Sequence, residues 1–192
     1  WTCSMVRYWT PSSTFNFAAI ANGTGTDCVN GIPTKISYTL NGADPADLVY
    51  GTAAATTDAS CAPSGNITNG IVSFTLEHLL ARVKVSFQNK IEGGDYTYAI
   101  SAVTLTTWDK GVYTIGAQSP WARTDETTDV ALPYTLNEDA LASLEYNSTT
   151  PTEAGAQVLI PGAQMILRFT YELKLKGSNG EATTIYTETV SK

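Results

Sequence analysis

Apolar and polar side chains alternate along much of this chain, which is the pattern of a strand with one buried face. Residues 14–20 place Phe15 and Phe17 on the same face, and residues 35–40 repeat the alternation before an Asn-Gly turn. No helical spacing of apolar residues extends beyond two turns, apart from a marginal candidate at residues 137–144. The pattern predicts a chain built from strands, with only short helical turns.

The most regular alternation runs from residue 71 to residue 87. The helix-favouring residues 77–81 interrupt it, which predicts a bulge or one helical turn between two strands. We expect the apolar residues of both halves to face a single core, together with Val103 and Leu105. The six residues of this predicted face are Val72, Phe74, Leu76, Val83, Val85 and Phe87.

Turn residues divide the rest of the chain. Asp109-Lys110-Gly111 predicts a tight hairpin, and residues 177–180 predict a final hairpin between strands at 166–176 and 183–190. Residues 52–70 consist mostly of Ala, Thr, Ser, Gly, Asn and Pro, so we expect a long surface loop there.

Together these segments predict about seven to ten strands without crossover helices, which is typical of antiparallel sheets packed as a sandwich or barrel. A chain of 192 residues can bury a sizeable core without metals or disulfides. We expect one β-sandwich domain over residues 1–192. The abrupt start at Trp1 and the end at Lys192, directly after a strand-like segment, suggest a processed piece of a longer surface protein.

The charge balance argues against two classes of partner. The net charge is -7, and the 11 basic residues are not clustered. Binding to nucleic acid or to an anionic membrane surface needs a positive patch. No stretch approaches the ~20 apolar residues of a membrane-spanning helix. We therefore expect an extracellular protein without a nucleic-acid partner and without direct binding to a membrane surface.

Three cysteines lie in the first third of the chain without the paired spacing of a zinc site. In an oxidising compartment Cys28 and Cys61 could pair, because both lie in segments rich in turn residues. The alternative is that Cys3, Cys28 and Cys61 are all unpaired thiols. The sequence leaves both open.

The residues for catalysis are sparse. His78 is the single histidine, it lies between Leu76 and Leu79, and no nucleophile motif is present. We interpret it as a buried, hydrogen-bonded residue at the strand break. The acidic groups do not follow the spacing of a calcium loop and lie in predicted loops. We expect no catalytic residues, no metal and no cofactor.

Aromatic residues offer a binding alternative. Trp121 and Trp1 could stack on sugar rings, as exposed tryptophans do in carbohydrate-binding modules. They could equally close the ends of a sandwich core. The alternation around Trp9 and Trp108 favours the core interpretation.

A resemblance to a known family rests on four features in order. The segment at residues 72–85, Val-Ser-Phe-Thr-Leu-Glu-His-Leu-Leu-Ala-Arg-Val-Lys-Val, resembles the strand, kink and strand signature of the Bacteroidetes fimbrillin-like proteins. Its central residues are His78, Leu80, Ala81, Arg82 and Val83. Trp9 with residues 15–19, the strand at residues 47–50 and the Pro-terminated run at residues 158–161 are similar to further family features.

This resemblance implies a transthyretin-like β-sandwich that corresponds to the N-terminal domain of a two-domain surface lipoprotein. Such proteins are subunits of type V pili or related adhesins on the outer membrane. Stalk subunits are joined when a strand of one fills a groove in the next. The expected partners are therefore other pilus subunits or ligands on host or bacterial surfaces. The resemblance carries over no catalytic residues.

Overall fold

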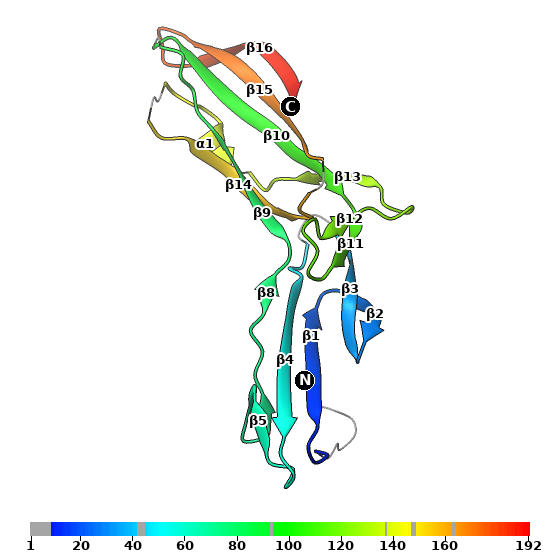
Figure 1. The fold of residues 1–192 in the computed structure, drawn as a ribbon. Coiled ribbons are helices and arrows are strands. Elements are labelled where there is room, and N and C mark those ends of the chain that lie inside the picture. The colour runs from blue at the N-terminus through cyan, green and yellow to red at the C-terminus, as the bar shows by residue number, and fades with distance from the viewer. Residues whose placement is uncertain (1–8, 42–44, 93, 137, 147–148, 163) are drawn as a thin grey trace. The chain divides into compact units, whose positions relative to one another are not determined.

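The computed structural model describes residues 9–41, 45–92, 94–136, 138–146, 149–162 and 164–192 (Figure 1). These residues form sixteen strands and one short helix. Every strand pair with a described register is antiparallel. The predicted antiparallel all-β fold is therefore confirmed. The strand number exceeds seven to ten because several strands are only two residues long and some alternating segments are divided between two sheets.

The chain divides into two compact units, and each is assembled from three separate segments. The first unit contains Trp1–Tyr38, Asp47–Leu79 and Val112–Pro120. The second contains Thr39–Ala46, Leu80–Gly111 and Trp121–Lys192. The single domain expected over residues 1–192 stays a prediction.

The first unit has two main sheets. One has the order β1-β4-β5, with β8 also paired to β4, and the other pairs β2 with β3 and β3 with β11. β6 and β7 form a separate antiparallel pair. The strands are β1 (Thr14–Ala21), β2 (Thr24–Val29), β3 (Ile32–Thr39), β4 (Val49–Thr57), β5 (Pro63–Gly65), β6 (Ile67–Thr68), β7 (Ile71–Val72), β8 (Glu77–His78) and β11 (Lys110–Thr114).

β4 corrects the loop predicted at residues 52–70. Ala53, Ala55 and Thr57 are buried, while the residues between them are exposed, so this stretch has the period of a strand. Its side chains are small, and the alternation therefore has little hydrophobic contrast. The full length of β1 pairs with β4, from Thr14 opposite Thr56 to Ala21 opposite Val49.

Residues 73–76 lie against β4 without forming a strand. A Cβ atom on Gly51 would overlap the carbonyl of Thr75, so the close approach requires glycine at this position. Phe74 is only half-buried and Leu76 is 48% exposed. The predicted common face of Val72, Phe74 and Leu76 with the later strand is wrong, because these residues belong to the first unit.

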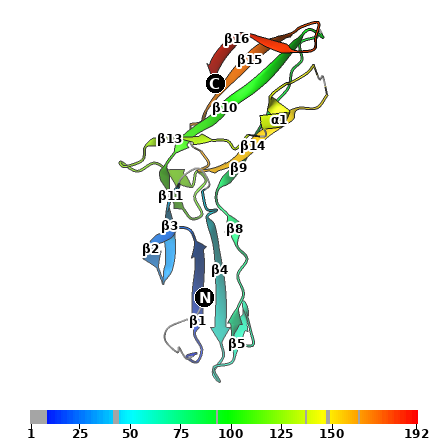
Figure 2. The same ribbon diagram turned by 180° about the vertical axis from the view of Figure 1, so that it is seen from behind.

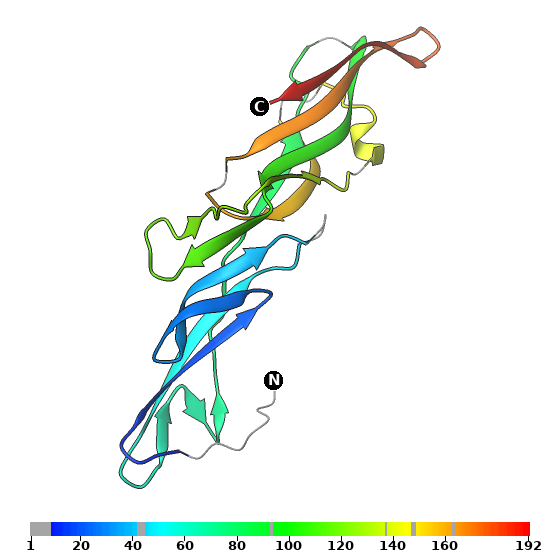
Figure 3. The same ribbon diagram turned by 90° about the vertical axis from the view of Figure 1, so that its right-hand side faces the viewer.

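The second unit contains two sheets of antiparallel strands, in the orders β13-β10-β15-β16 and β14-β9. Figures 2 and 3 show β10, β15 and β16 running side by side. The Trp121 ring of β12 lies against Gly111. The elements are β9 (Ala81–Phe87), β10 (Tyr96–Trp108), β12 (Trp121–Ala122), β13 (Asp129–Pro133), α1 (Glu138–Leu141), β14 (Thr152–Leu159), β15 (Ile166–Lys176) and β16 (Ala182–Ser191).

The core of the second unit lies between these two sheets. Val103, Leu105 and Leu159 are almost fully buried in it, and Val83, Val85 and Phe87 pack against its margin. The second half of the predicted face is therefore confirmed. A register shift between Ser101 and Thr104 reverses the alternation of β10, so that Ile100 and Val103 both reach the core.

Two turn predictions had different outcomes. The final hairpin is confirmed, since β15 pairs with β16 and the Gly177 N–H donates to the Glu181 carbonyl at 2.7 Å. The hairpin at Asp109 is wrong, because β10 and β11 belong to different sheets. Asp109 marks a sheet change instead, and its carboxylate accepts hydrogen bonds from the Thr128 N–H at 2.7 Å and hydroxyl at 2.8 Å.

Candidate binding groove and pocket of the second unit

An apolar groove of about 330 Å³ lies beside the end of β9 in the second unit. β10 and β15 supply most of its floor, because the alternating residues of these two neighbouring strands point to one side. We name it the aromatic groove. Its main lining residues are Phe87, Ile91, Tyr98, Ile100, Phe169 and Tyr171.

Ring contacts order the floor of the aromatic groove. Phe87 meets Phe169 nearly edge-on with ring centroids 4.9 Å apart. Tyr98 lies 5.9 Å from Tyr171, which lies 6.1 Å from Tyr186 on β16, so the tyrosines form a row across three strands. These separations are those of favourable aromatic pairs, and the rings therefore hold one another in place.

The Tyr171 hydroxyl is fixed by the neighbouring strand. It donates a hydrogen bond of 2.7 Å to the Glu188 carboxylate. This hydrogen bond, followed by burial and the negative charge of Glu188, raises the pKa of Tyr171 to about 12. The Tyr171 hydroxyl therefore stays protonated to a higher pH than a free tyrosine, and its hydrogen bond holds the side chain toward β16.

Two sheet edges beside the aromatic groove lack a partner within the described chain. β9 pairs with β14 alone, so its other edge has no strand beside it among the described residues. β16 is the outer strand of its sheet, and all of its residues except Val190 are exposed. Tyr186 is 50% exposed and Ile185 is 51% exposed. The unpaired edge of β9 thus borders the groove through Phe87, and the exposed Tyr186 of β16 contacts the lining residue Tyr171.

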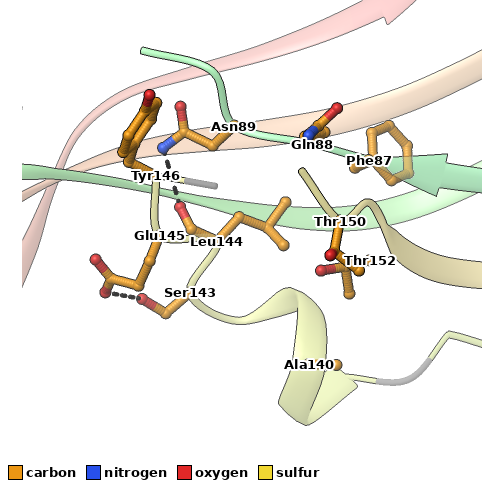
Figure 4. Close-up of a pocket in the computed structure, with 10 residues that line it drawn as sticks. All are labelled: Phe87, Gln88, Asn89, Ala140, Ser143, Leu144, Glu145, Tyr146, Thr150 and Thr152. Carbon is orange, nitrogen blue, oxygen red and sulfur yellow. Dashed lines mark hydrogen bonds between the residues drawn. The ribbon is translucent and has the colours of Figure 1, made fainter. Parts of the chain in front are cut away.

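A second, smaller pocket of about 220 Å³ adjoins the aromatic groove and shares Phe87 with it (Figure 4). Its lining is rich in hydroxyl and amide groups, in contrast to the groove. We name it the polar pocket. Its lining includes Phe87, Gln88, Ser143, Tyr146, Thr150 and Thr152.

Hydrogen bonds fix the wall of the polar pocket opposite β14. The buried Asn89 amide donates to the Leu144 carbonyl at 3.1 Å, and its oxygen accepts from the Ile91 N–H at 3.0 Å. Leu144 also exchanges two backbone hydrogen bonds with Tyr98. The stretch after α1 is therefore held by isolated bridges rather than by a continuous ladder.

Two lysines of β15 contact the same wall of the polar pocket. Lys176 pairs with Glu145 at 2.5 Å, and Lys174 donates to the Ala142 carbonyl at 3.4 Å. Since β10 lies between β15 and this segment, both side chains cross over β10. The long apolar stems of lysine suit such a crossing.

His78 is placed differently from the prediction. Its side chain is 76% exposed, so the expectation of burial is wrong. β8 has only two residues and pairs with β4 on one side, which leaves the imidazole at the outside of the sheet. Nδ1 of His78 does form the expected hydrogen bond, to the carboxylate of Asp47.

The remaining residues of the fimbrillin-like signature lie where the chain leaves the first unit and enters the second. Leu80 is half-buried, and Ala81, Arg82 and Val83 begin β9, where Arg82 is exposed opposite Val158. The break at residues 77–81 is neither a bulge nor a helical turn. It is the point where the chain leaves β4 and pairs with β14.

The tryptophans of the described chain are all half-buried. Trp9 packs on Phe15 with ring centroids 4.7 Å apart, and the Trp108 ring lies 5.5 Å from the guanidinium of Arg123. Trp121 rests on Gly111. Trp1, the other predicted glycan contact, lies outside the described residues.

Other site chemistry is limited in the described residues. Cys28 and Cys61 are free thiols, so their proposed pairing is wrong, and Cys3 lies outside the described residues. The part of the chain that the structure describes contains no group of three or more potential metal-ligating side chains. None of its helical structure has the length and apolar character required to traverse a bilayer.

Comparison with known proteins gave a structural match. Neither the family models nor the curated proteins contain a match to this sequence. A crystal structure of a fimbrial protein from Bacteroides vulgatus matches with a TM-score of 0.58 and 17% sequence identity. The chain shares the fold of that protein. The match covers 89% of this chain and 62% of the fimbrial protein chain, so this chain corresponds to less than two thirds of its length.

Sequence reasoning did not find the aromatic groove. Tyr98 and Ile100 are visible in the sequence as an alternating pair, but Phe169 and Tyr171 lie about seventy residues later. Only the pairing of β10 with β15 brings the two sets together. The sequence signal that indicates the groove is an aromatic residue at alternate positions in both β10 and β15.

Proposed function

We propose that this chain is a non-enzymatic structural subunit of a surface fimbria, and that it accepts an extended strand of a neighbouring subunit at the aromatic groove. The observation that carries this proposal is the coincidence of the unpaired β9 edge with the uncovered apolar face of β15 and β16. The shared fold with a Bacteroides fimbrial protein supports it.

The physical basis is the addition of a strand to an open edge. The free N–H and C=O groups of β9 would pair with the backbone of the incoming strand, which provides affinity independent of sequence. Alternate apolar side chains of that strand would enter the groove against Phe169 and Tyr171. A strand with polar residues at those positions would bury them without partners and bind poorly.

The proposal also gives a cellular location. A subunit of this kind acts at the cell surface, where its partners are other pilus subunits or surface ligands. We further propose that the complete protein is a lipoprotein of the outer membrane of a Bacteroidetes cell, anchored through a segment outside this chain. The fimbrillin-like signature at residues 78–83 supports this assignment.

The competing hypothesis of a carbohydrate-binding module acting through Trp121 and Trp1 has less support. Trp121 is half-buried and its ring rests on Gly111. Trp9 precedes β1, Trp108 ends β10 and Trp121 begins β12, and none of them lines the aromatic groove or the polar pocket.

The test uses one charged substitution in the aromatic groove. Ile91 lines the groove and is 56% exposed, so Ile91→Lys should leave folding intact while placing an ammonium group where an apolar side chain must enter. In cells that produce the full-length protein, we expect the amount of the variant in sheared surface filaments to fall at least about tenfold, as measured by immunoblot.

The matched control is Ile71→Lys, at a 68% exposed isoleucine of β7 in the first unit. This variant should enter filaments at the wild-type level. Equal melting temperatures of the two purified variants would show that folding is unaffected. Incorporation of Ile91→Lys at the wild-type level would overturn the groove as the assembly site.

A further inference from the structure

The polar pocket has a different chemistry from the aromatic groove and needs a separate explanation. Strand addition uses apolar side chains, whereas hydroxyl and amide groups dominate this lining. We propose that the polar pocket binds one neutral pyranose residue of a glycan. This proposal does not depend on assembly into fimbriae.

The lining matches the two kinds of surface on a pyranose. A sugar ring presents C–H groups on its faces and hydroxyl groups around its rim. The rings of Phe87 and Tyr146 offer apolar surface, and Tyr146 is 42% exposed at the pocket. Gln88, Ser143 and Thr152 bring amide and hydroxyl groups to the same space. The Ser143 hydroxyl already donates to the Glu145 carboxylate at 3.3 Å and offers a sugar its acceptor lone pairs, while the Thr152 hydroxyl can both donate and accept, as sugar hydroxyls do.

The charges around the pocket select a neutral ligand. Glu145 is the charged residue of the lining, and its carboxylate is already paired with Lys176 at 2.5 Å. The hydroxyl of Tyr146 lies 3.3 Å from the carboxylate of Glu92. No cationic side chain lines the pocket among the described residues. An acidic sugar or a phosphate would therefore meet the carboxylates of Glu145 and Glu92, while Lys176, the cation nearest to them, is already engaged by Glu145.

The size and rigidity of the pocket suit a single ring. Its volume of about 220 Å³ is below the ~300–1,000 Å³ of sites for drug-sized ligands. The wall that carries Ser143 and Tyr146 is fixed without a ligand. The hydrogen bonds of Asn89 and Lys174 and the ion pair of Lys176 hold it in place. Figure 4 shows this wall facing Thr150 and Thr152 across the pocket. A prearranged wall reduces the entropy lost on binding.

The test is a titration of the purified chain with neutral methyl pyranosides of glucose, galactose, mannose and N-acetylglucosamine, followed by amide NMR spectra. We expect at least one sugar to bind in the millimolar range and to shift the amide signals of Leu144, Thr150 and Thr152. Methyl glucuronide, which adds a carboxylate to the same ring, should bind at least about tenfold more weakly.

Three variants locate the site. Tyr146→Ala should weaken binding at least about tenfold, while Tyr146→Phe keeps the ring and should retain binding. Tyr96→Ala removes a tyrosine of the same 42% exposure that lines neither the polar pocket nor the aromatic groove, and it should have no effect. Melting curves of all three verify folding. The proposal fails if no neutral sugar shifts the pocket amides, if the glucuronide binds as well, or if Tyr146→Ala binds normally.

Discussion

At the scale of single residues, Tyr38 shows how the core of the first unit changes the chemistry of one side chain. Tyr38 is 3% exposed, and burial, followed by the negative charge of Asp47, raises its pKa from 10.0 to about 12. The folded state therefore holds the phenolic proton more tightly than the unfolded state. The stability that depends on this proton is complete below pH 10 and is lost as the pH rises through 12.

We predict that the free energy of unfolding of the wild-type chain falls more steeply between pH 10 and pH 12 than that of Tyr38→Phe. The phenylalanine variant keeps the buried ring but has no proton to lose. Urea unfolding at several pH values measures both slopes. Equal slopes would show that Tyr38 ionises as easily in the folded state as in the unfolded state.

His78 shows a limit of sequence reasoning about single residues. Its apolar neighbours correctly indicate a strand break, but not which side of the strand faces outward. The edge position of β8, and therefore the exposure of the imidazole, depends on pairing with residues 49 and 50. Long-range pairing of this kind leaves no trace in a window of local sequence.

At the scale of elements, regular alternation identified strands better than it identified their partners. β1, β3, β9, β15 and β16 all occur close to the predicted segments. β4 was missed beyond Tyr50 because alanine and threonine alternate there with little difference in polarity. The hairpin at Asp109 was assigned wrongly because a turn between two strands looks the same whether they pair or diverge into separate sheets.

The division of residues 71–87 between two units leads to a test with two leucines. Leu105 of β10 is 3% exposed in the core of the second unit, whereas Leu76 is 48% exposed. We expect Leu105→Ala to lower the free energy of unfolding by about 2–5 kcal/mol and Leu76→Ala by less than about 1 kcal/mol. Chemical denaturation gives both values. A large effect of Leu76→Ala would restore the common core expected from the alternation.

At the scale of the whole molecule, the chain passes from one unit to the other five times, after residues 38, 46, 79, 111 and 120. The sequence marks two of these passages, as a strand break at residues 77–81 and a turn at residues 109–111, but composition hardly changes at any of them and nothing indicates a change of unit. Each unit consequently depends on segments that are distant in sequence. β3 of the first unit pairs with β11, and the Ile115 N–H donates to the Thr34 carbonyl at 2.9 Å.

We predict that a fragment of residues 1–79 lacks a cooperative thermal transition, because it leaves the β11 side of β3 without a partner. Circular dichroism during heating measures the transition. Adding a peptide of residues 110–120 in excess should raise the melting temperature of the fragment. A fragment that melts as sharply as the complete chain, with no response to the peptide, would contradict this dependence.

The five passages also bear on how such a gene can change. Recombination at one position between residues 39 and 120 of two related genes would join part of each unit from one parent to the rest of both units from the other. Neither unit occupies a continuous stretch of coding sequence, so no single exchange replaces one and leaves the other intact. A single exchange that replaces all of one unit therefore always replaces part of the other as well.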